Sequence, residues 1–165
     1  MTLPTELAQS VFRKQSTLTV EQEFLQAVVG HFGADTGTLH VIDSQDGLLH
    51  LRATSGEIPP QVQDIIRTIP LGKGIAGQAA ERREPVSICN IKSDTTSVVR
   101  PGAKSMGIEG ALCVPMIAND KVVGTLGIGF RRARTFSEAE QRFLLEAGRA
   151  FAEGLLKQTR ASTSL

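Results

Sequence analysis

The chain has 165 residues, of which 41% are apolar and 21% charged, and a formal net charge of +1, which is typical of one globular domain. Basic residues are scattered apart from Arg131, Arg132 and Arg134, and Trp and Tyr are absent, so we expect no nucleic-acid partner. There is no signal-peptide pattern and no apolar run of membrane-spanning length. We therefore expect a cytoplasmic protein with no membrane partner.

The N-terminal quarter of the chain has the spacing of two amphipathic helices. Apolar residues recur at helical intervals over residues 2–16. Thr19 followed by Gln22 matches a capping box, which predicts the start of a second helix. The apolar stripe of that helix runs over residues 20–32, and Gly33 is suited to end it.

A hairpin is predicted next. Two extended runs, 36–43 and 48–55, flank Ser44-Gln45-Asp46-Gly47, whose Asp-Gly pair is a strong turn signal. A connection of even length places His40 and His50 on opposite faces of the sheet, and we favour that length. Two histidines without a third ligand also make a poor zinc site. We predict no metal site here.

The middle of the chain predicts two short helices and a strand. Segment 59–70 begins and ends with proline and carries apolar residues at helical spacing through Ile69. Segment 71–91, LGKGIAGQAAERREPVSICNI, has glycines at 72, 74 and 77 that indicate a tight turn before a short alanine-rich helix. Pro85 ends that helix, and the β-branched residues at 86 and 88 predict a strand.

The glycines of GKGIAG match the G-x-G-x-x-G spacing of dinucleotide-binding folds. That motif requires a buried strand directly before the first glycine. Here a helical pattern and Pro70 precede it. We therefore interpret the glycines as a requirement of chain geometry and expect no nucleotide phosphate at this turn.

Residues 90–107 have no clear periodicity, and a loop of that length usually covers a site. Residues 110–117 and 121–130 then predict a second hairpin. The first of these runs is almost wholly apolar, which indicates a strand covered on both faces. Glycines in the second run indicate close approach of a helix or a ligand.

The C-terminal part predicts one long helix. Ser137 and Glu140 form a capping-box pattern, and an apolar stripe follows them. We expect the helix to end near Lys157 and residues 158–165 to form a flexible tail. The predicted organisation is thus a helical extension over residues 1–17, one domain over residues 18–157, and the tail.

These elements predict an α+β fold with an antiparallel sheet of five or six strands. Helices from the two chain ends cover one face, and the short middle helices and the 90–107 loop cover the other. A ligand cavity is expected under the second cover. His40 and Cys113 are candidates for its floor, although periodicity does not identify which face of the sheet the ligand meets.

The chain resembles a GAF domain. The resemblance is carried by TGTLHVID, LLHLRATSG, IPLGKGIAGQAAERREPVSICNI, GIEGALCVPMIANDKVVGTLGIGF and TFSEAEQRFLLEAGRAFAEGL. It implies a three-layer α/β/α domain with a small-molecule pocket, acting in signal transduction. It also implies a homodimer formed through the terminal helices and a partner protein that reads the signal. Relatives usually adjoin an output module and this chain contains none, so we expect a stand-alone sensor or a piece of a longer protein.

The resemblance places the ligand between the sheet and its cover. Arg100 and Lys104 can meet a carboxylate or a phosphate, so we expect a small anionic ligand. No cofactor is identified. The expected ligand contacts are Ile75, Ala79, Asn90, Ser97, Val98, Arg100, Lys104, Met106 and Cys113.

Two ligands of relatives are not expected here. Relatives that bind cyclic nucleotides resemble one another in an Asn-Lys pair followed by Phe and then Asp-Glu. This chain keeps Phe136 and Glu140 but has Ala139 and lacks the Asn-Lys pair. Relatives that carry bilins attach them through a Cys near the roof of the pocket or upstream. Neither Cys89 nor Cys113 lies in the expected roof, so no chromophore is predicted.

Two alternatives to the sensor stay open. One is a structural dimerisation module without a ligand. The other is a free methionine-R-sulfoxide reductase, an activity found on this fold, which needs an accessible thiolate and a second Cys within disulfide reach. That resemblance implies three cysteines and aromatic residues around the sulfoxide, whereas this chain has two Cys and no Trp or Tyr. We therefore predict no enzyme, and the test is whether Cys89 and Cys113 meet.

Overall fold

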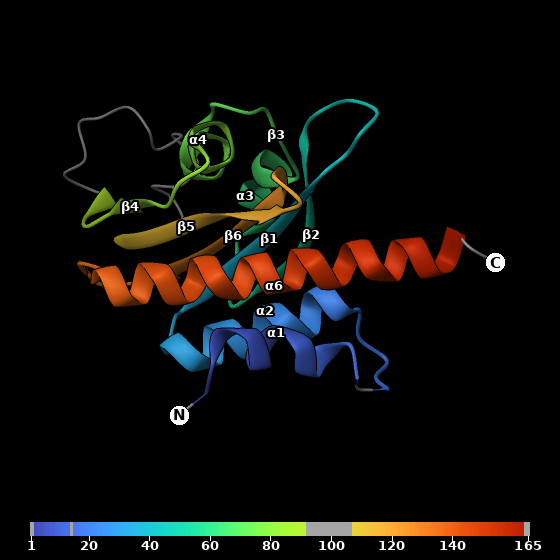
Figure 1. The fold of residues 1–165 in the computed structure, drawn as a ribbon. Helices are drawn as coiled ribbons and strands as arrows, with labels where there is room; N and C mark the ends of the chain where they lie inside the picture. The colour runs from blue at the N-terminus through green and yellow to red at the C-terminus, as the bar shows by residue number, and fades with distance from the viewer. Residues whose placement is uncertain (1, 14, 92–106, 164–165) are drawn as a thin grey trace.

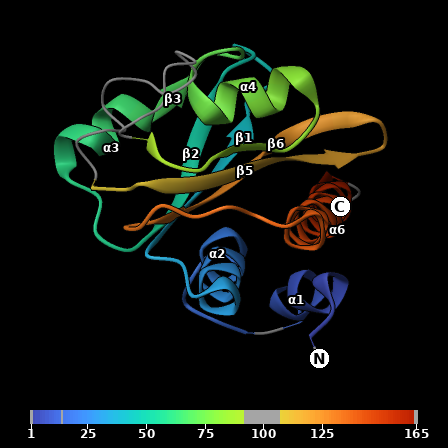
Figure 2. The ribbon, with the colours of Figure 1, turned by 90° about the vertical axis from the view of Figure 1, so that its left-hand side faces the viewer.

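The computed structural model describes residues 2–13, 15–91 and 107–163. The described helices are α1 (Pro4–Val11), α2 (Val20–Phe32), α3 (Pro60–Ile66), α4 (Gly74–Arg82) and α6 (Glu138–Thr163). The described strands are β1 (Thr36–Ile42), β2 (Leu49–Ser55), β3 (Thr68–Ile69), β4 (Val86–Ile88), β5 (Gly110–Ala118) and β6 (Lys121–Phe130). Figures 1 and 2 show α2 and α6 on one face of the sheet and α3 and α4 over the other, while α1 packs outside α2 and α6. The expected α+β layers are confirmed.

The sheet has the topology that two hairpins and added edge strands produce. Its strand order is β3-β2-β1-β6-β5-β4, and every neighbouring pair is antiparallel. In the first hairpin His40 pairs with Leu51 and Val41 with His50. Because paired residues share a face, His40 and His50 lie on opposite faces, as the even-length connection over residues 43–48 predicts.

Local signals fix the ends of α2. The Thr19 hydroxyl accepts a hydrogen bond from the backbone N–H of Gln22 at 3.2 Å, as expected for an N-cap. The Gln22 side chain does not return to the cap. It donates to the carbonyl of Thr54 on β2 at 2.8 Å instead, so only half of the predicted capping box forms. Gly33 ends α2 in the left-handed conformation with a φ of 64°.

The helix predicted through Ile69 is wrong in its last turn. α3 ends at Ile66, and Ile69 lies in β3, where it pairs with Leu49 of β2. Ile69 has the spacing expected of an apolar helix stripe, but its side chain is buried at the edge of the sheet. The C-terminal helix is also longer than predicted, because α6 continues past Lys157 to Thr163. The expected tail is therefore helical over most of its length.

The glycine turn before α4 is shorter than expected. Gly72 and Gly74 adopt positive φ values of 85° and 65°, which residues with a Cβ rarely adopt. Gly77 lies inside α4 instead of in the turn. A Cβ on Gly77 would lie 2.5 Å from the carbonyl oxygen of Pro70, so this glycine allows the helix to lie against the preceding turn.

The main core lies between the sheet and the terminal helices. Phe24 and Phe151 stack there with ring centroids 4.3 Å apart. β5 is buried along nearly its whole length, which confirms the strand covered on both faces. In β6, Gly124 meets the backbone of β1, since a Cβ would lie 2.0 Å from the carbonyl oxygen of His40. Within the described segments, no helix combines the length and apolar character needed to cross a bilayer.

Arg134 joins the end of β6 to the start of α6. Its guanidinium lies 4.3 Å from the ring centroid of Phe130 and 4.9 Å from that of Phe136. It also forms an ion pair with Glu140. Glu140 accepts from the backbone N–H of Ser137 at 3.0 Å and donates its own N–H to the Ser137 hydroxyl at 3.1 Å. The predicted capping box of α6 is confirmed, and Arg134 ties it to the sheet.

We predict that Arg134→Ala lowers the free energy of unfolding by about 1–3 kcal/mol, because it removes two ring contacts and a partly buried ion pair. Arg134→Lys should recover only part of the loss, since an ammonium cannot stack as a guanidinium does. Urea denaturation measures both. Arg149→Ala is the control, because its pairs with Glu146 and Glu153 are more exposed and contribute less. Equal losses for the two alanine variants would contradict the prediction.

Candidate ligand-binding cavity

A cavity of about 130 Å³ lies between the sheet and the α3 and α4 layer. Its floor comes from β1, β5 and β6, on the face opposite α2 and α6, and its walls come from α3, α4 and the flanking residues Ile91 and Ile108. Figure 2 shows α3 and α4 above this face of the sheet. The expected floor candidates His40 on β1 and Cys113 on β5 both line the cavity, whereas Thr36 and Thr38 of β1 were not expected there.

Two glycines of β6 lie on the floor. Gly127 pairs with Thr38 of β1 on one side and with Cys113 of β5 on the other. A Cβ on Gly127 would lie 3.1 Å from Thr38 Oγ1 and 3.7 Å from Cys113 Sγ. At Gly129 a Cβ would lie 2.6 Å from Thr36 Oγ1 and 3.1 Å from the Ile108 side chain, so neighbouring side chains already cover that position. The open part of the floor is therefore at Gly127, and the approach of a ligand there stays a prediction.

The walls are aliphatic and the described lining carries no charge. Six isoleucines line the sides: Ile65, Ile66, Ile69, Ile75, Ile91 and Ile108. The polar side chains among the described lining residues are those of Thr36, Thr38, His40 and Cys113. No Asp, Glu, Lys or Arg is among these lining residues.

His40 is fixed as a neutral ring at the floor. Its side chain is 2% exposed, and its Nε2 lies 2.8 Å from the carbonyl oxygen of Ile66. A carbonyl can only accept, so we assign the proton to Nε2. Burial lowers the pKa of His40, while the hydrogen bond to Ile66 opposes that shift and His50 adds to it. His40 thereby ties β1 to the end of α3.

The lowered pKa of His40 predicts a loss of stability on acidification. Below about pH 6.5 the unfolded chain binds a proton at this histidine that the folded chain rejects. The free energy of unfolding should therefore decrease as the pH is lowered below about 6.5. The decrease should be at most about 1.4 kcal/mol per pH unit and should stop once the pH is below the pKa of His40 in the folded protein. Chemical denaturation at several pH values between 5 and 8 measures this slope. His40→Gln should reduce it, whereas His31→Gln at the end of α2 is the control. An unchanged slope in His40→Gln would contradict the assignment.

The two cysteines do not meet. Cys113 lies on the cavity floor and is buried, while Cys89 is exposed beyond the end of β4. Cys113 pairs with Val86, three residues before Cys89, and three residues of strand span about 10 Å. That separation exceeds the reach of a disulfide. Burial also raises the pKa of the Cys113 thiol to about 12, so it is not a reactive thiolate.

Thiol titration tests this description of the cysteines. In the native protein one thiol, Cys89, should react rapidly with an aromatic disulfide reagent at pH 8. Cys113 should react only on unfolding, since about one thiol in ten thousand is ionised there and the sulfur is buried. Cys89→Ser should abolish the rapid phase and Cys113→Ser should leave it unchanged. Two rapid thiols, or a disulfide formed on mild oxidation, would contradict the structure.

The predicted contacts are only partly brought together. Ile75 and Cys113 line the cavity. Ala79 is buried against Val86 and Cys113 and does not line it. Asn90 is half-buried and precedes the lining residue Ile91. Ser97, Val98, Arg100, Lys104 and Met106 lie outside the described residues.

His40 on β1 and the cover by α3 were expected, whereas Thr36 and Thr38 were not named. Thr36, Thr38 and His40 alternate along β1, which is the signal of one strand face carrying polar side chains. Which face the ligand meets could not be decided before the register was known. The role of Ile66 was also not predicted, since it supplies both a wall and the carbonyl that holds His40.

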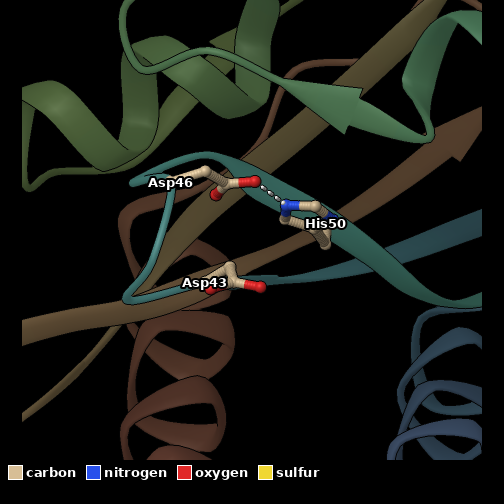
Figure 3. A group of neighbouring side chains, drawn as sticks. All are labelled: Asp43, Asp46 and His50. Atoms are coloured by element: carbon tan, nitrogen blue, oxygen red, sulfur yellow. Dashed lines mark hydrogen bonds and ion pairs between the residues drawn. The ribbon is translucent and has the colours of Figure 1, made fainter.

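A second group of polar side chains lies at the first hairpin. Asp43, Asp46 and His50 place one potential metal-ligating atom each within 4.8 Å of one another, as Figure 3 shows. His50 Nε2 lies 2.7 Å from a carboxylate oxygen of Asp46. Asp43 and Asp46 also accept backbone N–H bonds from Gln45 and Leu48. These bonds explain the aspartates as turn formers.

Comparison with known proteins identifies the family. The family model described as GAF domain matches residues 15–155. The chain belongs to the GAF domain family. The six-stranded antiparallel sheet with its two helical layers is the GAF fold, as the sequence resemblance implied. No curated protein matches the chain in sequence.

Solved structures share the GAF fold at low identity. The GAF domain of a phosphoenolpyruvate-protein phosphotransferase from Coxiella burnetii has a TM-score of 0.77 and 23% identity, over 98% of this chain and 95% of that one. The corresponding Acinetobacter domain has a TM-score of 0.76 and 20% identity, over 96% and 92%. A free methionine-R-sulfoxide reductase from Neisseria meningitidis, in complex with its substrate, has a TM-score of 0.78 and 16% identity, over 96% and 89%. The GAF fold is therefore found both in a domain of phosphoenolpyruvate-protein phosphotransferases and in a free methionine-R-sulfoxide reductase.

Proposed function

We propose that this GAF domain is a small-molecule sensor whose ligand occupies the cavity over β1, β5 and β6. The observation that carries the proposal is the open floor of the cavity at Gly127. Protein interiors are close-packed, and a central sheet position without a side chain usually admits something else. Ile75 and Cys113 are proposed ligand contacts, together with Thr36 and Thr38. Asn90 is proposed to contribute from the margin.

The sensor is proposed to signal through β5. Along this strand Ala111 and Cys113 face the cavity, whereas Leu112 and Val114 belong to the core beneath α6. A ligand that displaces the floor therefore moves residues packed against the C-terminal helix. Such a signal requires that the two positions of α6 differ in ligand affinity. We propose that α6, with α1, forms a homodimer face in the cytoplasm and that a partner protein reads its position.

The reductase alternative receives no support from the cysteines. Free methionine-R-sulfoxide reduction needs an accessible thiolate and a partner thiol. Cys113 is buried and Cys89 is too far along the sheet, so this pair cannot complete such a cycle without movement of the backbone.

The dimerisation alternative differs from the sensor in one respect, which is whether a ligand ever fills the cavity. The experiment is designed to separate these two.

We predict that Gly127→Val abolishes ligand binding, because its side chain fills the hollow between Thr38 and Cys113. Native mass spectrometry of protein purified from its own cells should find a small-molecule mass on the wild type and none on this variant. The small-molecule fraction of a cell extract should raise the thermal midpoint of the wild type alone.

The matched control is Gly30→Ala in α2. A Cβ at Gly30 meets nothing within 4 Å, and α2 lies on the other face of the sheet, so this variant should bind as the wild type does. Circular dichroism checks that Gly127→Val folds before it is tested. A wild type with no bound mass and no thermal shift would favour the structural dimerisation module.

A further inference from the structure

The size of the cavity limits what can enter it. A volume of about 130 Å³ is close to that of an engineered protein cavity that holds benzene, which is about 150 Å³. The group bound inside is therefore the size of one ring or of a short branched chain. The surrounding isoleucines offer branched aliphatic surface on the sides, so contact with this group is mainly apolar.

The described lining also restricts charge. A buried carboxylate or ammonium is expensive unless a partner neutralises it. The described lining has no charged side chain, and His40 is a neutral ring whose Nε2 is already bonded to Ile66. Among the described lining residues a charged group would therefore find no partner, which favours an uncharged group in the part of the cavity that they form.

Two polar groups on the floor are available. One is the Nδ1 atom of His40, which is buried without a hydrogen-bond partner among the described residues and, as the unprotonated ring nitrogen, can only accept. The other is the hydroxyl of Thr38. Thr38 is half-buried and lines the cavity, and its hydroxyl lies beside the space left by Gly127. Within the described residues no hydrogen bond engages Thr38 Oγ1. Thr36 is 3% exposed and offers less surface, and the Cys113 thiol is a weak hydrogen-bonding group. A hydroxyl can both donate and accept, so Thr38 suits a ligand that bears a hydroxyl of its own.

We propose that the cavity selects an uncharged, ring-sized group bearing one hydroxyl, and that Thr38 is the residue that recognises this hydroxyl. The inference rests on the proposed sensor function and adds the chemical class of the ligand. Apolar contact with the isoleucine walls provides affinity. The bond to Thr38 provides discrimination, because a ligand hydroxyl that enters the cavity without a partner loses its hydrogen bonds to water.

Matched probes test the proposal on the full chain. Phenol and toluene have the same shape and differ in the hydroxyl, and benzoate adds a negative charge. Dissociation constants come from chemical-shift titrations of the isotopically labelled protein. Thr38→Val keeps the shape of the side chain and removes its oxygen, while Thr38→Ser keeps the oxygen.

The expected result is a change in the ratio of the two dissociation constants. Thr38→Val should raise the dissociation constant of phenol relative to that of toluene by about 5- to 10-fold, as expected for the loss of one hydrogen bond. Thr38→Ser should restore the wild-type ratio, and benzoate should bind the wild type more weakly than phenol. Gly127→Val should bind neither phenol nor toluene, which shows that the probes enter this cavity.

Three results would overturn the inference while leaving the sensor proposal standing. The first is a ratio of the phenol and toluene dissociation constants that is the same in the wild type and in Thr38→Val. The second is benzoate binding in the cavity as tightly as phenol. The third is a wild-type spectrum unchanged by phenol and toluene while the cell extract still raises the thermal midpoint. If the extract also has no effect, both proposals fail.

Discussion

The hollow at the centre of this GAF domain depends on strand register. Gly127 lies directly between Thr38 and Cys113 only because β1 and β5 both pair with β6 in the observed alignment. A shift of one residue would turn Leu126 or Ile128 toward α4 and expose the core face of the sheet. The large core between the sheet and the terminal helices therefore holds the strand register. The same register forms the proposed ligand site on the opposite face of the sheet, under α3 and α4.

An open floor at the centre of a sheet departs from the close packing of protein interiors. A larger residue at 127 would make contacts that glycine does not make and would also raise strand propensity. A ligand in the space of about 130 Å³ would supply such contacts instead, which connects the packing of the sheet to the proposed sensor.

Local chemistry made much of the fold predictable. The cap at Thr19, the capping box at Ser137 and the Asp-Gly turn act within a few residues, so one sequence is enough to identify them. Ile69 was misassigned because its helical spacing competes with pairing to Leu49, a residue 20 positions earlier. The end of α6 was misplaced because a polar composition past Lys157 does not by itself end a helix.

The site was less predictable than the fold because it is made of positions that mean little alone. In the sequence alone, Gly127 indicates that another group lies close to the strand. Whether that group is a helix or a ligand depends on which face of the sheet residue 127 occupies. His40 was a candidate for the floor from the sequence, but Thr38 became one only when the register set it beside Gly127. Residues that meet across strands require tertiary information that composition and spacing do not contain.

The fold alone cannot assign a chemistry, since the solved structures that share it include domains of phosphotransferases and sulfoxide reductases at comparable similarity. The groups on the floor are therefore decisive. A reductase requires ionised sulfur, whereas burial keeps Cys113 protonated and the sheet register separates it from Cys89. What remains on the floor is a neutral imidazole, hydroxyls and a protonated thiol among aliphatic walls. These groups of the described floor can select and hold a molecule, which is the role proposed for the cavity.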